Sequence, residues 1–242
     1  MRIALVQLQC RAGQVLHNRS RHLDILQKAA SLKADFMLFP ELSLTGYEPT
    51  LVNQLAMLPD DPLLEPFSVL SRQHNLSFGI GCPLRVKGGI AIGMMLFVPS
   101  GRRTVYTKQY LHPDEEPYFV AECTVPLLPS PLDAIGLAIC YEISIPRHAL
   151  AHHQDGKGIY LASVAKSKEG MAIARPRMQE IATQYHQITG IANSVGPNDD
   201  FIGWGGTTWW DAHGTHLGTM GETTEGVLLL DTGYMIVESY LI

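Results

Sequence analysis

The sequence of 242 residues contains no long apolar run. No stretch approaches the roughly 20 apolar residues that a helix needs to cross a bilayer, so we expect no membrane partner. The opening segment MRIALVQLQC also differs from a secretory signal, because Gln7 and Gln9 interrupt its apolar residues within a few positions. These absences predict a soluble protein located in the cytoplasm.

Cysteine is scarce as well. The four cysteines, Cys10, Cys82, Cys123 and Cys140, lie far apart and form no CxxC pair. In a chain of this length without an export signal, that pattern indicates reduced cytoplasmic thiols. Basic residues are outnumbered, since 18 Lys and Arg stand against 23 Asp and Glu and give a formal net charge of -5. The chain therefore lacks the basic footprint of a protein whose partner is nucleic acid.

The hydrophobic pattern changes between strand and helix periods along most of the chain. Alternation or short apolar runs predict strands over 2–9, 35–39, 76–84, 90–98, 102–108, 133–139, 158–164 and 189–195. Helical spacing predicts helices over 16–32, 62–75, from Pro146 onward and over 173–188. The stretch 109–130 is expected to be a long loop, and the chain from Phe201 to form short strands with Gly-rich turns. With no internal repeat or linker, residues 1–242 are predicted to form one α/β domain with layered sheets.

Three residues at the ends of predicted strands could carry chemistry. Glu41 lies in FPEL, at the sheet edge where open α/β folds bind ligands. Lys108 closes the segment RRTVYTK, and Cys140 closes DAIGLAIC. Taken singly, each also has an ordinary explanation: an exposed loop glutamate, a solvated lysine and a buried structural cysteine. Their occurrence in this order, each at a strand end, is more specific than any one of them.

Cys140 is the candidate nucleophile because it lies between a buried strand and the helix expected from Pro146. Backbone N–H groups and the positive end of a helix dipole at such a turn are expected to lower the thiol pKa from its usual value of about 8.5. The other three cysteines do not follow a strand and precede a helix, so they are expected to be structural or incidental.

Three segments that contain these residues resemble the glutamate, lysine and cysteine motifs of the nitrilase superfamily. They are FPELSLTGYEP, TKQYLHPDEEPYF and GLAICYEISIP, and the resemblance extends to GGTTWWDAHGT near the end of the chain. It implies a Glu–Lys–Cys triad on an α-β-β-α sandwich, two packed mixed sheets flanked by helices, without a metal or organic cofactor. Members of this superfamily cleave non-peptide carbon–nitrogen bonds in small molecules, and many are homodimers or higher homo-oligomers.

The resemblance also implies a mechanism. Glu41 would take the thiol proton while Cys140 attacks the carbonyl carbon. Lys108 and the backbone N–H of Tyr141 would face the developing oxyanion. The second glutamate of the family lies in the loop after the lysine, where we favour Glu115, with Glu116 as the alternative. Ammonia would leave, and water would then hydrolyse the thioester.

The substrate pocket is expected to be formed by loops such as 42–58, 109–130 and 163–175. Within or beside them, Tyr47, Glu116 and Ser163 are the side chains expected to contact the substrate. A carboxamide or N-carbamoyl substrate is favoured over a nitrile because Tyr141, not Trp, follows the cysteine.

The sequence departs from the family pattern around the pocket. After the cysteine, Ser144 and Arg147 stand where the family commonly has Arg and Glu, and the chain is short at its C-terminus. Two other functions therefore stay open: a catalytically silent homologue that binds a small molecule or a protein, and a glutaminase-type unit that supplies ammonia to a separate synthetase.

Two further patterns have alternative interpretations. In HALAHH, His148 and His152 share one helix face and could bind zinc, although a surface histidine cluster is the favoured interpretation. The run GWGGTTWWD could stack bases or sugars, although packing in the core or the pocket wall is favoured. Trp209 and Trp210 should point to opposite faces of a strand, so at most one of them faces the pocket.

Overall fold

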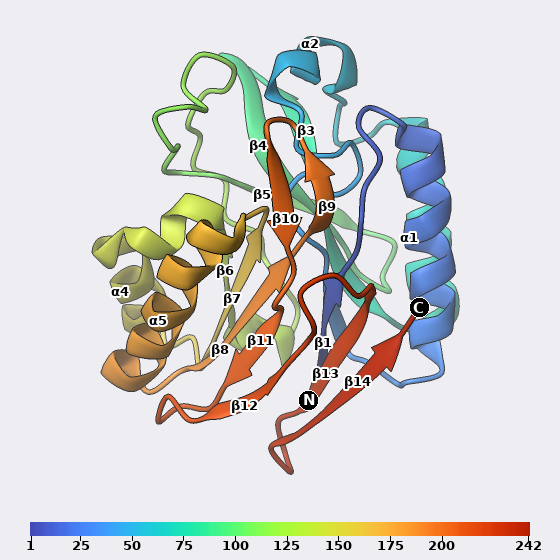
Figure 1. Cartoon of the computed structure of the whole chain (residues 1–242). Coiled ribbons are helices and arrows are strands. Elements are labelled where there is room, and N and C mark those ends of the chain that lie inside the picture. Colours follow the sequence, from blue (N-terminus) through green and yellow to red (C-terminus); the bar gives the residue numbers. More distant parts are fainter.

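Two β-sheets pack face to face in the computed structural model, which describes all 242 residues, and helices cover both outer faces (Figure 1). The seven-stranded sheet contains, in spatial order, β14 (Ile236–Leu241), β13 (Gly226–Asp231), β1 (Arg2–Gln7), β2 (Phe36–Leu38), β3 (Ser77–Val86), β4 (Gly89–Phe97) and β5 (Arg103–Thr107). The five-stranded sheet contains β12 (His216–Thr219), β11 (Thr208–Trp210), β8 (Ile188–Asn193), β7 (Ile159–Val164) and β6 (Ile135–Ile139). A separate ribbon joins β9 (Val195–Asn198) to β10 (Phe201–Trp204).

The helices lie in two groups on opposite sides of the sheets. One side carries α1 (Val15–Ala30) and α3 (Glu65–His74), and the other carries α4 (Pro146–Gln154) and α5 (Lys168–Tyr185) (Figure 1). The short helix α2 (Val52–Leu55) and the 3-10 turns Pro49–Leu51, Pro62–Leu64, Leu132–Ala134 and Cys140–Ser144 lie in the connections. The expected α-β-β-α sandwich is thereby confirmed. None of these helices is both long and apolar enough to span a membrane.

Side chains that alternate along a strand supply separate hydrophobic layers. In β1, Ile3 and Leu5 point into the layer between the two sheets, whereas Ala4 and Val6 point toward α1 and α3. A third layer lies between the five-stranded sheet and the helices α4 and α5. Because each central strand contributes to two layers, its sequence is apolar on both faces, as buried parallel strands require.

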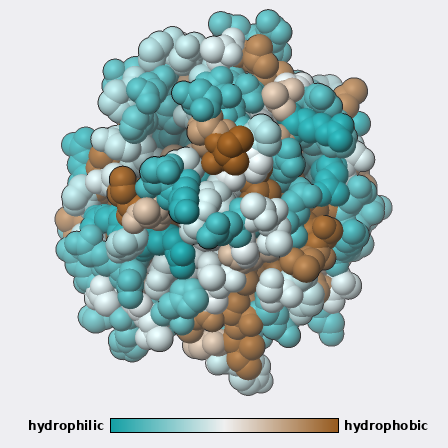
Figure 2. All heavy atoms as spheres, viewed as in Figure 1, coloured by the Kyte–Doolittle hydropathy of each residue, from teal (hydrophilic) through white to brown (hydrophobic).

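The first helix shows where the hydrophobic pattern was misleading. Its buried face contains Ile25, Leu26 and Ala29, as helical spacing predicts. Leu16, the first residue of the predicted helix 16–32, is instead 65% exposed because it lies in the first turn of α1. Exposed apolar side chains are otherwise scattered, and the face in Figure 2 is mainly hydrophilic, with apolar residues in small separate groups.

Most predicted elements are present with shifted ends. The structure contains all eight predicted strands, and the long loop between β5 and β6 has no strand or α-helix. The helix predicted over 173–188 begins earlier, at Lys168, because the side chain of Ser167 accepts a hydrogen bond from the N–H of Gly170 and caps it. The helix predicted over 62–75 divides into the 3-10 turn Pro62–Leu64 and α3.

Candidate active site

Cys140 follows β6 in a strained backbone conformation. Its φ of 46° lies in the left-handed region, which residues other than glycine rarely adopt. A 3-10 turn, Cys140–Ser144, follows the strand, and α4 then begins at Pro146, as predicted. Such strain concentrates at functional sites, where it fixes the direction of a side chain. Here it leaves Cys140 partly accessible and on the wall of a pocket.

The electrostatic expectation for Cys140 is wrong. Burial of the sulfur, and after it the charge of Glu41, raise the pKa of the Cys140 thiol to about 11. Lys166 and Lys108 lower the pKa, but their effect does not compensate for the lost hydration. The thiol is therefore protonated at neutral pH and needs a base to become a nucleophile.

Glu41, Lys108 and Glu115 form one buried ion-pair group. Lys108 Nζ donates hydrogen bonds to Glu41 Oε1 at 2.8 Å and to Glu115 Oε1 at 2.6 Å. Burial alone would lower the pKa of the Lys108 ammonium, but the surrounding negative charges raise it above its usual value. Burial raises the pKa of the Glu41 carboxyl, and Lys108 opposes this shift. Two carboxylates share one cation, so the group holds a net negative charge when both are ionised.

One carboxylate oxygen of Glu41 makes no hydrogen bond. Its Oε2 is buried and has no hydrogen-bond partner of normal geometry, and the Cys140 thiol is close enough to lower the pKa of the carboxyl. An unpaired buried oxygen is costly, so its presence calls for an explanation, such as a role in catalysis. The free oxygen of Glu41 is thus available to accept a proton from the cysteine.

The turn that holds Glu41 rests directly on β3. Phe39 N–H donates to Gly79 O at 3.0 Å, and Leu44 N–H donates to Gly81 O at 2.9 Å. A Cβ atom on Gly81 would lie 2.3 Å from Leu42 N and 2.6 Å from Pro40 O. Only glycine permits this close approach of two backbones, so Gly81 fixes the position of the glutamate turn.

Glu115, not Glu116, lies against the lysine. Glu115 is buried, its Oε1 also accepts a hydrogen bond from Tyr47 Oη at 3.0 Å, and its Oε2 accepts one from the N–H of His112 at 2.8 Å. Glu116 is exposed and does not line the pocket. The buried position in the loop between β5 and β6 therefore belongs to the favoured glutamate.

The pocket beside these residues has a volume of about 270 Å³. Its walls include Tyr47, Glu115, Cys140, Tyr141 and Lys166, so all three expected loops or their flanks contribute. A larger groove of about 500 Å³ lies along α5 beside Trp204 and Trp210, but no cysteine or acid lines it. The smaller pocket is the one that combines a thiol with a carboxylate.

Ser163 does not contact this pocket, contrary to expectation. It lies on β7 on the same face as Ile159 and Leu161, which pack between the sheets. Its hydroxyl donates a hydrogen bond to Phe39 O at 2.8 Å and is buried. Ser163 therefore joins the two sheets immediately behind the Glu41 turn, and its contact is structural.

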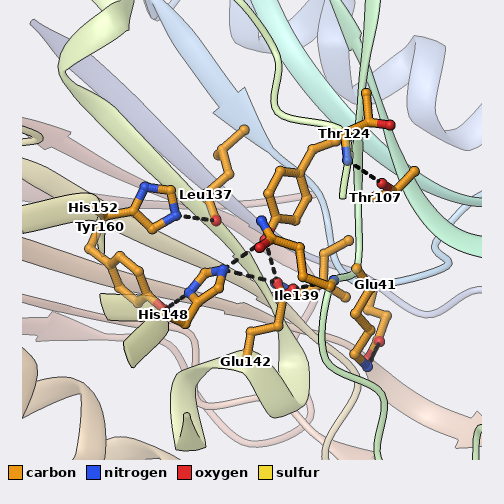
Figure 3. Close-up of polar contacts among 12 residues, drawn as sticks. Glu41, Thr107, Thr124, Leu137, Ile139, Glu142, His148, His152 and Tyr160 are labelled. Carbon is orange, nitrogen blue, oxygen red and sulfur yellow. Dashed lines mark hydrogen bonds and ion pairs between the residues drawn. The ribbon is translucent and has the colours of Figure 1, made fainter. Parts of the chain in front are cut away.

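A second group of buried polar residues surrounds Glu142, two residues after the cysteine (Figure 3). Glu142 accepts hydrogen bonds from Tyr106 Oη at 2.6 Å and from the N–H groups of Gln109 at 2.6 Å and Ile139 at 2.7 Å. It thereby connects the backbone after Lys108 with the backbone before Cys140. The sequence pattern did not indicate this role, and the only signal was an acid two positions after the nucleophile candidate.

The histidines of α4 are not a surface cluster, which corrects that interpretation for His148 and His152. His148 Nε2 lies 2.8 Å from Tyr106 Oη, and its Nδ1 lies 2.8 Å from Tyr160 Oη. His152 Nε2 lies 3.1 Å from Leu137 O (Figure 3). No group of three or more His, Cys, Asp or Glu side chains is placed to hold a metal ion.

The tryptophans pack in different layers, as their alternation predicts. Trp209 lies between the sheets and donates from Nε1 to Leu228 O at 3.1 Å, whereas Trp210 lies in the layer under α5. Neither lines the Cys140 pocket.

Comparison with known proteins identifies the family of the chain. The sequence model of the family described as carbon-nitrogen hydrolase matches residues 2–232. The chain belongs to the carbon–nitrogen hydrolase family. It is 27% identical over 204 residues to an (R)-stereoselective amidase of a Pseudomonas species, an alignment that covers 83% of this chain and 73% of the relative. It is also 25% identical over 231 residues to a glutamine-dependent NAD(+) synthetase of Thermotoga maritima, which covers 88% of this chain but 39% of that protein.

Solved amidases share the fold of this carbon–nitrogen hydrolase. A mutant of the amidase from Nesterenkonia sp. AN1, with acrylamide added to its active-site cysteine, superposes with a TM-score of 0.86 at 24% identity, covering 96% of this chain and 92% of that one. Another mutant of the same amidase, in complex with butyramide, gives a TM-score of 0.86 at 23% identity, covering 96% and 90%. The resemblance to the nitrilase superfamily is confirmed, and the family identifies the chain as a carbon–nitrogen hydrolase.

Proposed function

We propose that the chain is one catalytic domain that hydrolyses the C–N bond of a small linear carboxamide or N-carbamoyl compound through a thioester on Cys140. The observation that carries the proposal is the free oxygen of buried Glu41 beside a thiol whose pKa is raised to about 11. Such a thiol is inert without a base, and the carboxylate is the group positioned to act as one.

In the proposed reaction, Glu41 takes the Cys140 proton as the sulfur attacks the carbonyl carbon. Lys108 Nζ and the N–H of Tyr141 stabilise the oxyanion, and Glu115 holds Lys108 in place. Collapse of this intermediate breaks the C–N bond while Glu41 passes the proton to nitrogen, so that ammonia leaves. Glu41 then deprotonates a water molecule, which adds to the thioester and releases the acid and the thiol.

Lys108 is suited to this role because two carboxylates fix its position before the substrate binds. Preorganised donors lose little reorganisation energy when charge develops on the oxygen, and one such donor typically contributes about 3–4 kcal/mol. Tyr47 contributes indirectly, since its hydroxyl donates to Glu115. We further propose a homodimer on the basis of the family resemblance, which sedimentation analysis of the purified protein would test. A cytoplasmic location is proposed separately, from the four unpaired cysteines.

Intact-mass measurement of an acyl adduct on Cys140 tests the nucleophile and the substrate class together. A panel of amides, ureido compounds and nitriles should give an adduct with at least one amide or ureido compound, accompanied by ammonia release. Cys140→Ala should lose both signals and stay folded, whereas Cys123→Ala, at an exposed position, should keep them. A protein that acylates with no compound would favour a silent homologue.

A second candidate is suggested by the similarity to the Thermotoga maritima synthetase, of which this chain spans 39%. A glutaminase-type unit would release ammonia from glutamine for a separate synthetase. Glutamine in the same panel distinguishes the two functions, because a simple amidase should prefer other amides to glutamine.

A further inference from the structure

Lys166 lies at the mouth of the proposed active site on a rigid backbone. It follows β7 and precedes α5, and its N–H donates to Asn193 Oδ1 at 2.8 Å. Its carbonyl accepts from Asn193 Nδ2 at 3.0 Å and from the N–H of Trp204 at 3.0 Å. The backbone N–H and carbonyl of Lys166 are both hydrogen-bonded to neighbouring elements. The side chain therefore starts from a fixed point on the pocket wall.

The side chain of Lys166 runs along the wall and does not extend freely into solvent. A Cβ atom on Gly170 would lie 3.2 Å from Lys166 Cβ, 3.4 Å from Cγ and 3.7 Å from Cδ, so the aliphatic stem packs over the first turn of α5. Lys166 and Gly170 both line the Cys140 pocket. The charge of Lys166 also lowers the pKa of the Cys140 thiol, by more than that of Lys108 does.

The ammonium of Lys166 has no acidic partner. None of the ion pairs or side-chain hydrogen bonds of the structure includes its Nζ, whereas Lys108 has two carboxylates. The acids nearby have other contacts. Glu115 is bonded to Lys108, Tyr47 and the N–H of His112, and the exposed Glu169 accepts from the Ser167 hydroxyl at 2.9 Å. A free cation on the wall of a pocket is a binding site for an anionic group.

We propose that Lys166 binds a carboxylate of the substrate, so the preferred substrate is a short linear amide with a carboxylate at the opposite end. The inference rests on the proposed function and narrows it. Lys166 immediately precedes the N-terminus of α5, an 18-residue helix whose dipole also favours an anion at this position. The pocket of about 270 Å³ has the volume of about nine water molecules at roughly 30 Å³ each, so it has room for a small ligand only. The monoamides of the four- and five-carbon dicarboxylic acids are small enough to fit.

The test compares kcat/KM for succinamate and glutaramate with kcat/KM for the uncharged butyramide and valeramide. We expect the wild type to prefer the anionic amides and Lys166→Met, which keeps the apolar stem, to lower the anionic-to-neutral ratio at least about tenfold, as expected from losing a hydrogen bond between charged groups. Lys166→Arg should retain much of the preference. The matched control Lys168→Met removes a charge two residues away, outside this pocket, and should change the ratio no more than about twofold.

A second measurement does not depend on amide turnover. Iodoacetate and iodoacetamide alkylate the same Cys140 thiol, and intact mass follows both reactions. The ratio of the iodoacetate rate to the iodoacetamide rate therefore reports only recognition of the carboxylate. Lys166→Met should lower this ratio, and Lys168→Met should not.

A variant in which both reagents or both substrate classes slow equally would overturn the inference, because Lys166 would then act on the thiol alone. Hydrolysis of neutral amides with no anionic preference would overturn it too, while the proposed function would stand. If no amide turns over and none acylates Cys140, the proposed function fails, and the alkylation ratio still decides the role of Lys166.

Discussion

Two groups of buried polar side chains lie a few residues apart in this sandwich, and they differ in charge balance and access. The group of Glu41, Lys108 and Glu115 contains a cation between two carboxylates and borders the pocket of Cys140. The group around Glu142 has no lysine or arginine within ion-pair distance and does not line that pocket. Both bury a carboxyl whose pKa is raised, so a shifted pKa alone does not identify the reacting group. The feature that distinguishes the two groups is access to the pocket of the Cys140 thiol.

Hydrogen bonds compensate for the burial of the Glu142 carboxyl. Burial raises the pKa of the Glu142 carboxyl to about 7, and the donors from Tyr106, Ile139 and Gln109 oppose this shift. Burial lowers the pKa of His148 to about 3, so the imidazole stays neutral. Because these donors flank Lys108 and Cys140 in the sequence, the group restrains the backbone beside both proposed catalytic residues and does not line their pocket.

The largest effect should follow the loss of the cation. Lys108→Met leaves Glu41 and Glu115 buried together without a cation, and breaking such an ion pair costs about 3–5 kcal/mol of the free energy of unfolding. Loss of an oxyanion donor should also lower kcat by about 100- to 1000-fold. Steady-state kinetics and urea unfolding measure both. The exposed Lys87→Met is the control, and a fall in kcat below tenfold would argue against the oxyanion role.

Glu142→Gln should have a smaller effect on both quantities. A glutamine has one acceptor oxygen, so at least one donor among Tyr106, Ile139 and Gln109 loses its partner, at about 1–3 kcal/mol. We expect kcat to fall about tenfold, since this energy restrains the backbone beside Lys108 and Cys140, and KM to change less. Unchanged kcat in a destabilised variant would limit Glu142 to a structural role.

The pH dependence of that variant sharpens the comparison. The folded pKa of Glu142, about 7, exceeds its ordinary value of 4.5, so the folded protein binds the extra proton between these two values. Its contribution to stability is therefore fully present below pH 4.5 and is lost as the pH rises through 7. The difference in free energy of unfolding between wild type and Glu142→Gln should accordingly be larger at about pH 5 than at about pH 8. A difference that grows with pH would contradict the raised pKa.

The sequence predicted the contiguous features of this site better than those formed by distant elements. Glu41, Lys108 and Cys140 each lie in a short motif at a strand end, and the strands were visible as apolar runs. Ser163 was wrongly expected to contact the substrate. Alternation along the strand places it on the same face as Ile159 and Leu161, which belong to the core between the sheets. The Glu142 group needs Tyr106, His148 and Tyr160 from three other elements, and no local pattern brings these together.

The thiol of Cys140 shows a related limit. A strand-to-helix turn favours a lowered pKa, and this local argument omits the burial of the sulfur, which has the opposite sign and is larger. The pocket segment 163–175 was predicted, but Lys166 was not singled out within it, because the direction of its side chain depends on contacts with Gly170 in α5 and Asn193 in β8. Site features formed by one short segment of the chain were thus predictable from the sequence. The pKa shifts and the direction of Lys166 required the packed structure.

The smallest predicted effect isolates the outer end of the Glu142 group. Tyr160→Phe removes the hydroxyl 2.8 Å from His148 Nδ1 and should lower the free energy of unfolding by about 1 kcal/mol, the typical net value of one hydrogen bond. The bonds from Tyr106, Ile139 and Gln109 to Glu142 remain, so kcat should stay near that of the wild type. Urea unfolding and steady-state kinetics on the same preparation give both values. Because Tyr160→Phe and Glu142→Gln disturb the same buried group, a loss of kcat in the second variant alone would assign the effect on catalysis to the bonds that hold the Lys108 and Cys140 backbones. An equal loss in both would mean that His148, and not the carboxyl, transmits the constraint.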